Sequence, residues 1–265
     1  MEPLQRVSPI IWSGQGRGPS CGRVIPEEVP IAITYDHNTY AVMMATPADL
    51  ADFAIGFSLT EEVIGHPSDI EELEVLSHSE GVELRMRLAP GRGEVLIGRR
   101  RRLAGPTGCG LCGIDSLREA IRPARQVGAG RCFTSGEIYR ALAALPPAQL
   151  LNRQTKAVHA AAFWEPEAGL IAGREDVGRH NALDKLVGAL ACMERPSAQG
   201  LLLLSCRLSI EMVQKAAVMG APVIVAVSAP TALALRVAEA AEITVIAVAR
   251  EDGFEVFTYP HRVIA

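Results

Sequence analysis

A chain of 265 residues, 49% of them hydrophobic, can bury a sizeable core, so we expect one large folded domain or two modest ones. The formal net charge of −4 argues against nucleic acid as a general partner, because domains that bind nucleic acid are usually basic. Six cysteines are too few for a disulfide framework and favour a cytoplasmic protein. A signal-peptide pattern and a run of about 18 apolar residues are both missing, so we expect no membrane partner.

The chain begins with a segment of weak pattern and continues with a hairpin. Residues 1–22 are rich in Gly, Pro and Ser, which predicts a loose tail. Apolar residues then alternate from Val24 to Met44, and residues 36–38 interrupt the alternation with turn-forming types. This pattern predicts two antiparallel strands joined by a turn.

A helix and further strands complete the N-terminal part. Thr46 and Asp49 have the spacing of a capping box, with a proline at the first helical position, so a helix is expected to begin there. Further strands are predicted at residues 73–76, 82–88 and 94–97. Together these elements predict a small α+β unit over residues 23–102.

Residues 103–130 predict a flexible loop and linker, which carries the pair Cys109 and Cys112. Glycines stand before, between and after these two cysteines, and glycine resists regular structure. Four arginines at 99–102 lie just upstream, and cationic neighbours favour the thiolate form of cysteine. The segment therefore indicates a mobile loop that carries two thiols.

Four interpretations of the C-x-x-C pair remain open. A structural zinc site usually needs four ligands, and the chain has no second C-x-x-C. A thioredoxin-like dithiol would follow a strand and open a helix, whereas this pair follows an arginine run and a Gly-Pro turn. The other two interpretations are a swinging thiol that carries a sulfur atom between partners and a loop without a chemical role.

Residues 131–265 predict an α/β domain with a largely parallel sheet. Thr134 and Glu137 form a capping-box pattern for a helix that ends at two prolines. Asn181 is expected to cap a later helix, with Asp184 in the box position. His159 follows as either a core histidine or a pocket residue. Strands and helices then alternate, which implies parallel strands with right-handed crossovers. The expected strands are residues 169–172, 201–205, 222–228 and 243–249, with an edge strand at 254–259.

Polar segments follow these strands, where open parallel sheets bind their ligands. Helices are expected to begin after the first three strands, and helix N-termini favour phosphate. Arginines in these segments can add bidentate phosphate contacts. The polar segments are residues 174–181, 205–209, 228–231 and 250–253.

At this point the residues show a resemblance. The run Gly-Arg-Glu-Asp-Val-Gly-Arg-His-Asn-Ala-Leu-Asp-Lys at 173–185 is similar to the signature of the formate dehydrogenase accessory sulfurtransferases, the FdhD family. The thiol segment at 108–113 and the motifs at 159–161, 209–212, 215–217 and 228–231 follow in matching order. This resemblance implies a C-terminal three-layer domain like that of the cytidine deaminases.

The resemblance also implies a function. A cysteine desulfurase would hand sulfur to Cys109 as a persulfide, with Cys112 assisting or resolving it. The sulfur would then pass to the molybdenum cofactor in its bis-molybdopterin guanine dinucleotide form, for insertion into formate dehydrogenase. The implied protein is a cytoplasmic homodimer, and GDP would mimic part of the cofactor. The residues expected to bind the cofactor are Val248, Ala249, Arg250, Glu251, Asp252, Gly253, Arg207, Ser228, His180 and Arg179.

Two rival functions are weighed beside this one. A zinc deaminase needs His-x-Glu followed by Pro-Cys-x-x-Cys, whereas here the cysteine pair precedes His159 and Ala161 stands in place of the acid. No metal is therefore expected. A chaperone that binds and delivers the molybdenum cofactor without moving sulfur is the other alternative. Cys206 stands where the family pattern has glycine.

Overall fold

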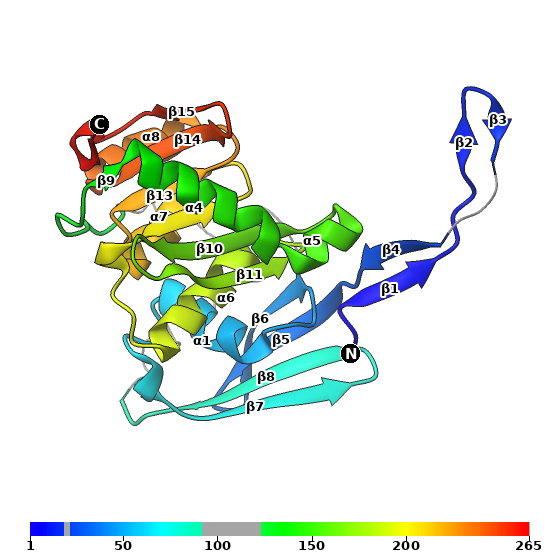
Figure 1. The fold of residues 1–265 in the computed structure, drawn as a ribbon. Coiled ribbons are helices and arrows are strands. Elements are labelled where there is room, and N and C mark those ends of the chain that lie inside the picture. The colour runs from blue at the N-terminus through cyan, green and yellow to red at the C-terminus, as the bar shows by residue number, and fades with distance from the viewer. Residues whose placement is uncertain (19–21, 92–122, 265) are drawn as a thin grey trace.

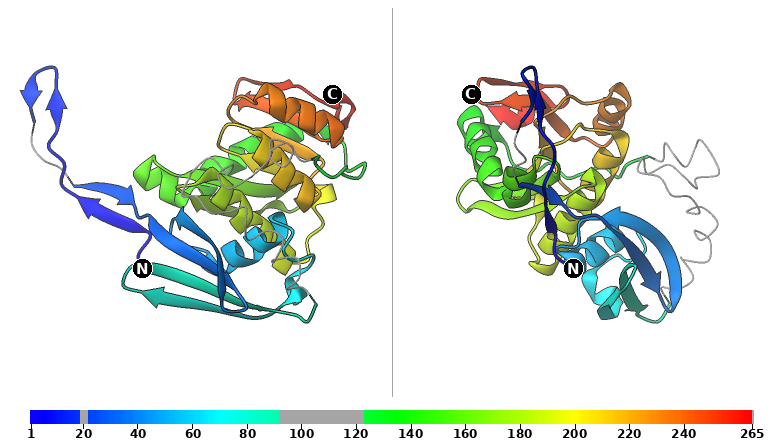
Figure 2. Two further views of the ribbon diagram at one scale, coloured as in Figure 1. Left: turned by 180° about the vertical axis from the view of Figure 1, so that it is seen from behind. Right: turned by 90° about the vertical axis from the view of Figure 1, so that its right-hand side faces the viewer.

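The computed structural model describes residues 1–18, 22–91 and 123–264, which form two packed lobes and a projecting arm (Figure 1). The N-terminal lobe is built on a four-stranded sheet and the C-terminal lobe on a six-stranded sheet. The arm, residues 1–18 and 22–26, extends away from both lobes (Figure 2). The strand predicted at 94–97 lies outside the described residues.

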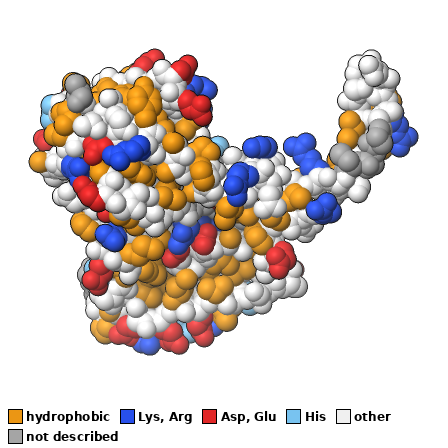
Figure 3. All heavy atoms as spheres, viewed as in Figure 1, with side chains coloured by type: hydrophobic (Ala, Val, Ile, Leu, Met, Phe, Trp, Pro, Cys, Tyr) orange, Lys and Arg blue, Asp and Glu red, His pale blue; other side chains and the backbone are white. Residues whose placement is uncertain are grey.

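The arm corrects the expectation of a loose tail. At its base, Leu4–Val7 (β1) pairs antiparallel with Arg23–Pro26 (β4), and its tip is a hairpin of Trp12–Ser13 (β2) and Gly16–Arg17 (β3). Trp12 itself is 73% exposed, and Figure 3 shows basic side chains along the arm. The sequence did not predict these strands, because each is too short to display an alternating pattern.

The N-terminal lobe packs one helix against a mixed sheet. Its elements are Val29–Tyr35 (β5), Asn38–Ala45 (β6), Leu50–Thr60 (α1), Ile70–His78 (β7) and Gly81–Leu88 (β8). The strand order is β6-β5-β8-β7, in which β5 and β8 are parallel and the other neighbours antiparallel. Asp36 and His37 have positive φ angles between β5 and β6, so the predicted hairpin is confirmed.

The start of α1 differs from the predicted capping box. Asp49 is the N-cap residue, with φ 52°, and its side chain makes no capping hydrogen bond. Thr46 is buried and contacts the C-terminal lobe, where its hydroxyl accepts a hydrogen bond from the Val177 N–H at 3.1 Å. The capping-box prediction was therefore wrong, because a tertiary contact occupies the threonine that would otherwise cap the helix.

The C-terminal lobe begins with the predicted capping box. Thr134 Oγ1 accepts from the Glu137 N–H at 3.1 Å, and the Glu137 carboxylate accepts from the Thr134 N–H at 2.8 Å. The helix that follows runs through both prolines to Ala148 rather than ending before them. The first elements are Phe133–Thr134 (β9), Ser135–Ala148 (α4), Leu150–Thr155 (α5), His159–Glu165 (β10), Gly169–Asp176 (β11) and Arg179–Cys192 (α6). The later elements are Leu201–Leu204 (β12), Ile210–Met219 (α7), Val223–Ala226 (β13), Ala232–Ala240 (α8), Thr244–Arg250 (β14), Gly253–Val256 (β15) and Val263–Ile264 (β16).

The six-stranded sheet is mixed rather than largely parallel. Its order is β11-β10-β12-β13-β14-β15, and β12, β13 and β14 are parallel neighbours as predicted. β10 lies antiparallel between β11 and β12, and β15 is an antiparallel edge strand. The sequence did not reveal β10 because its run of alanines at 160–162 has low strand propensity.

Helices cover both faces of this sheet, which makes the C-terminal lobe three-layered. Leu202 and Leu204 of β12 pack with residues of α6, α7 and α8, whereas Leu201 and Leu203 pack with residues of α4. Alternate residues of one strand point to opposite faces, so one leucine run fills two cores. The α/β class is confirmed, and the likeness to cytidine deaminases stays a prediction.

Two glycines allow the lobes to meet through a close contact of α1 and α6. A Cβ placed on Gly56 would lie 1.7 Å from the backbone oxygen of Asp184, and one on Gly188 would lie 2.0 Å from that of Asp52. Only glycine permits backbones to approach this closely. The N-terminal lobe therefore holds α6, and with it the first turn of α6, in a fixed position.

Candidate functional site

The polar segments predicted to bind a ligand gather at one edge of the six-stranded sheet. β11, β12, β13 and β14 all run in the same direction, and β10 runs the opposite way. The carboxyl ends of the four strands and the beginning of β10 therefore share this edge, which we call the strand-end site. The first turns of α6, α7 and α8 lie beside it, because each of these helices follows one of the strands.

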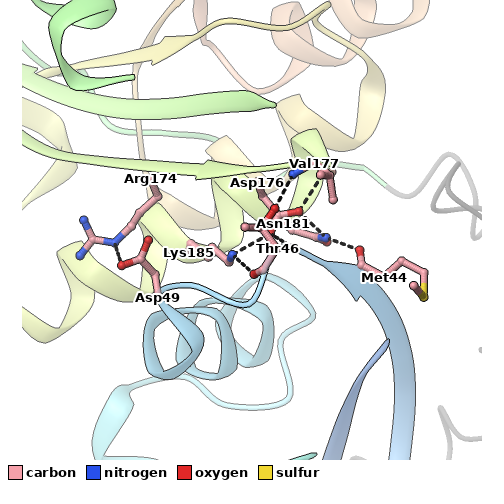
Figure 4. A network of polar contacts seen from close by, with 9 residues as sticks. Met44, Thr46, Asp49, Arg174, Asp176, Val177, Asn181 and Lys185 are labelled. Carbon is pink, nitrogen blue, oxygen red and sulfur yellow. Dashed lines mark hydrogen bonds and ion pairs between the residues drawn. The ribbon is translucent and has the colours of Figure 1, made fainter. Parts of the chain in front are cut away.

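Asn181 does not cap α6, contrary to the prediction. Gly178 is the N-cap residue, and Asn181 lies inside the first turn with its side chain buried. Its amide donates to the Met44 carbonyl at 2.9 Å and to Asp176 Oδ1 at 3.0 Å (Figure 4). Arg179 and His180, which the sequence assigned to the cofactor, occupy the same turn.

A buried ion pair secures this turn against the N-terminal lobe. Lys185 Nζ lies 2.6 Å from Asp176 Oδ2, and both side chains are fully buried. Lys185 also donates to the Thr46 carbonyl at 2.9 Å, while Asp176 accepts from the Thr46 N–H at 3.0 Å (Figure 4). Removing one member of such a pair typically costs about 3–5 kcal/mol, because the other charge stays buried without compensation.

A second buried carboxylate ties α6 to α7 and α1. Asp184 accepts hydrogen bonds from Lys215 Nζ at 2.8 Å and from the Thr60 hydroxyl at 2.6 Å. Burial raises the pKa of Asp184, and the neighbouring Lys215 opposes that rise. The sequence pattern placed Asp184 in a capping box, which is wrong, because its carboxylate faces the lobe interface instead of the start of its own helix.

The start of α7 carries polar side chains whose role the sequence did not reveal. Ser209 is the N-cap residue, but its side chain makes no capping hydrogen bond, and Glu211 follows in the first turn. His180 Nε2 lies 3.9 Å from Glu211 Oε2. Burial alone would raise the pKa of Glu211, but the adjacent His180 and Ser209 lower it to about 2. The carboxylate is therefore ionised at neutral pH.

Cys206 and Arg207 follow β12 at the same edge. Cys206 is buried, and burial raises the pKa of its thiol to about 11 although Arg179 and Arg207 act in the opposite direction. A thiol with this pKa stays protonated at neutral pH and is a poor nucleophile. Arg207 is exposed beside it and is open to a ligand.

His159 begins β10, at the strand-end site. Its register partner on β11 is Asp176, and it is half-buried. Burial lowers the pKa of His159, Arg179 and His180 lower it further, and Asp176 opposes them. The sequence left a core role and a pocket role open for His159. In the structure this residue is half-buried at the strand-end site.

The end of β14 has an irregular backbone. Val248 has a φ angle of 51°, which is rare for a β-branched residue, and the pairing with β15 shifts between Ala247 and Arg250. The Val248 N–H donates to the Ser228 carbonyl at 3.3 Å. Strained backbone of this kind is concentrated at functional sites. Arg250, Glu251 and Asp252 are exposed at the turn, whereas Ala249 is buried in the core beneath α4.

The two thiols assigned to catalysis, Cys109 and Cys112, lie outside the described residues, as does the arginine run at 99–102. Within the described ranges, Cys132 and Cys192 are exposed free thiols. No group of His, Cys, Asp and Glu side chains suited to a metal ion occurs in the part of the chain that the structure describes. Among the described helices, none has the length and apolar character needed to cross a membrane.

Comparison with known proteins gives consistent matches over most of the chain. The model of the FdhD/NarQ family matches residues 26–264. Curated proteins named Sulfur carrier protein FdhD from Agrobacterium fabrum and Brucella abortus are each 49% identical over 243 residues, which cover 91% of this chain and 90% of the relative. One from Cupriavidus necator is 44% identical, covering 90% of this chain and 83% of that protein.

The fold also matches a solved structure. This is the crystal structure of a protein from Desulfotalea psychrophila that is provisionally named a formate dehydrogenase accessory protein. The TM-score is 0.78 at 24% identity, and the match covers 98% of this chain and 99% of that one. At this identity the likeness establishes the fold.

Proposed function

We propose that this chain, which belongs to the FdhD/NarQ family, is a sulfur carrier that loads the molybdenum cofactor of formate dehydrogenase. In this proposal Cys109 receives sulfur from a cysteine desulfurase and passes it to the bis-molybdopterin guanine dinucleotide form of the cofactor. The name sulfur carrier protein, given to its curated relatives, supports the first half. The accessory-protein name of the structural relative supports formate dehydrogenase as the client. We place the reaction in the cytoplasm and the chain in a homodimer.

Sulfur loading requires one exchange reaction. The Cys109 thiolate attacks the terminal sulfur of the donor persulfide, a new S–S bond forms on Cys109, and the donor cysteine leaves as a thiolate. No net oxidation or reduction occurs. Four arginines at 99–102 precede Cys109 in the sequence, and their positive charge would favour its thiolate form. Cys112, three residues after Cys109, would assist or resolve the persulfide.

The strand-end site supports the second half of the proposal, because it has the features of a place for a charged cofactor. Arg207 and Arg250 are exposed at this edge and suit diphosphate oxygens. The strained turn that contains Val248 lies at the end of β14, inside the segment assigned to the cofactor. The observation that carries the proposal is the family membership combined with this edge, where exposed arginines and a strained turn lie at the ends of the strands.

The experiment replaces Cys109 with alanine and measures two properties separately. We expect Cys109→Ala to lose the ability to activate formate dehydrogenase, while GDP binding measured by calorimetry is unchanged. Cys132→Ala, which removes an exposed thiol from the described region, is the matched control and should retain both properties.

Each property tests a different half of the proposal. Full activation of formate dehydrogenase by Cys109→Ala would favour the alternative function, a chaperone that delivers the cofactor without moving sulfur. Absence of GDP binding by the wild-type protein would remove the assignment of the cofactor.

A further inference from the structure

The arm at the N-terminus, residues 1–18 and 22–26, projects from the body as a two-stranded ribbon (Figures 1 and 2). At its base β1 pairs with β4, and at its tip β2 pairs with β3. Between them the Gly18 N–H donates to the Ile11 carbonyl at 2.8 Å. A two-stranded ribbon is only marginally stable in water by itself, so an arm of this kind implies a surface against which it packs.

The tip of the arm carries large apolar side chains that are exposed to solvent. Trp12 is 73% exposed, Ile10 57% and Ile11 39%. Contiguous exposed apolar side chains commonly mark a protein–protein interface, and tryptophan is enriched among the residues that dominate binding energy there. The arm is also basic, since residues 1–26 include three arginines and one glutamate. The surface that receives the arm is therefore expected to combine apolar side chains with negative charge.

The tip of the arm is directed away from its own body. Only residues 27 and 28 separate β4 from β5. The Glu27 N–H donates to the Pro3 carbonyl at 2.9 Å, which extends the pairing of the ribbon to the start of the N-terminal sheet. The ribbon therefore continues outward from β5, and β2 and β3 lie far from both lobes (Figure 2).

A surface with the expected properties lies on the N-terminal lobe of the same chain. One face of the four-stranded sheet packs against α1, and residues that alternate with the core residues form the opposite face, which we call the outer face. On β6, Val42 and Met44 belong to the outer face and are 57% and 48% exposed. They lie opposite Ala32 and Pro30 of β5, so this half of the outer face is apolar.

The other half of the outer face, on β7 and β8, is acidic. Three of its carboxylates share two arginines. Arg85 Nη2 lies 2.9 Å from Glu83 Oε2, and Arg85 Nη1 lies 3.7 Å from Glu74 Oε2. Arg87 Nε lies 3.2 Å from Glu72 Oε2. The outer face therefore presents apolar side chains beside an excess of negative charge, which complements the apolar and basic arm.

We infer that the arm binds the outer face of a second copy of this chain, so that two copies exchange arms about a twofold axis. The tip covers Val42 and Met44, and the arginines of the arm face the carboxylates of β7 and β8. The arm is about as long as one side of a stable interface, which involves roughly 20–30 residues. Because the exchange is reciprocal, each dimer contains two such contacts. The inference rests on the homodimer of the proposed function and supplies its contact.

The first experiment measures the dissociation constant of the dimer by analytical ultracentrifugation of the full-length protein. We expect the wild-type protein to be a dimer. Trp12→Glu in the arm and Val42→Glu on the outer face should each raise the dissociation constant by about tenfold or more, because a charge enters an apolar contact.

A matched control separates this contact from exposed apolar side chains in general. Met193→Glu changes a side chain that is also exposed but lies at the end of α6, so this variant should dimerise as the wild-type protein does. Circular dichroism should show unchanged folding of all three variants, because each replaced side chain is exposed.

The second experiment distinguishes reciprocal exchange from pairing of the two arms with each other. A heterodimer of Trp12→Glu with Val42→Glu retains one wild-type contact, formed by the arm of the second variant and the outer face of the first. Mixing these variants should therefore restore dimers, which native mass spectrometry identifies by their mixed mass. Mixing Trp12→Glu with Ile10→Glu, both changed in the arm, should restore none.

Three results would overturn the inference, and they differ in what else they affect. A monomeric wild-type protein overturns the inference and the homodimer, but leaves the transfer of sulfur through Cys109 standing. A dimer that Trp12→Glu does not weaken overturns the role of the arm and leaves the homodimer standing. Loss of the dimer in Trp12→Glu but not in Val42→Glu overturns the outer face as the receiving surface.

Discussion

Individual charged and polar side chains at the strand-end site have environments unlike those in water. Glu211 stays ionised, Cys206 stays protonated, and His159 is pushed toward its neutral form. These three shifts have different causes, namely polar neighbours for Glu211, burial for Cys206, and burial with nearby positive charge for His159. The one cysteine described at the strand-end site, Cys206, is therefore a protonated thiol at neutral pH, and in our proposal the sulfur nucleophile is Cys109.

His159 gives a direct test of this electrostatic picture. Because burial and Arg179 disfavour its protonated form, NMR titration should give His159 a pKa below the ordinary value of 6.5. Arg179→Gln should raise that pKa without restoring it fully, since burial remains. The signal is identified by its loss in His159→Gln.

The same shift has a consequence for stability. Below about pH 6.5 the unfolded chain binds a proton at His159 that the folded chain takes up only at lower pH. The stability that His159 contributes is thus complete above pH 6.5 and is lost as the pH falls through its folded-state pKa. Denaturant unfolding of wild type and His159→Gln at several pH values should show this difference, and a pKa above 6.5 would contradict the account.

At the scale of elements, the contact of α1 with α6 decides how the lobes meet. It is made at two glycines, and the ion pair of Lys185 with Asp176 lies beside it on α6 and β11. Such an interface tolerates added side-chain volume poorly, because backbone atoms rather than flexible side chains fill the space.

Gly56→Ala should destabilise the protein by about 3 kcal/mol or more, at the upper end of the range for overpacked sites. The added methyl group would meet the Asp184 backbone oxygen at 1.7 Å. Gly136→Ala in α4 is the matched control, since its nearest neighbour would be 3.9 Å away. We expect this control to be neutral or slightly stabilising, as alanine favours helices. Denaturant midpoints measure both variants, and equal midpoints would show that the helices do not pack as described.

The sequence predicted elements whose signals are local and missed features that depend on distant parts of the chain. The hairpin around Asp36, the capping box at Thr134 and the strands β12 to β14 all follow from local patterns. Thr46 and Asn181 have the residue types of helix caps, yet both are used in contacts between the lobes. No local pattern separates these two uses, because the partners lie more than a hundred residues apart.

The candidate site shows the same division. The polar segments at strand ends could be predicted, because parallel strands bring their carboxyl ends to one edge. Glu211 belongs to the motif at 209–212 but was not among the residues expected to bind the cofactor, since in sequence it is an ordinary acidic residue in a first helical turn. Its spacing from Ser209 was visible, but its approach to His180 depends on how α6 and α7 lie in the fold.

At the scale of the whole molecule, the chain combines a rigid two-lobed body with a site at one sheet edge. In our proposal the body holds the cargo, and Cys109 brings the sulfur to it. Of the described thiols, Cys206 is buried, burial together with Asp52 raises the pKa of the exposed Cys192, and Cys132 is exposed. In our proposal the sulfur is carried by Cys109, which lies outside the described residues.

The central claim is tested most directly by the mass of the peptide that contains Cys109 after incubation with a cysteine desulfurase and cysteine. The account predicts a gain of one sulfur atom on Cys109, reversed by a reductant and absent from the peptides of Cys132 and Cys192. An unmodified Cys109 under conditions in which the desulfurase loads another acceptor would contradict it.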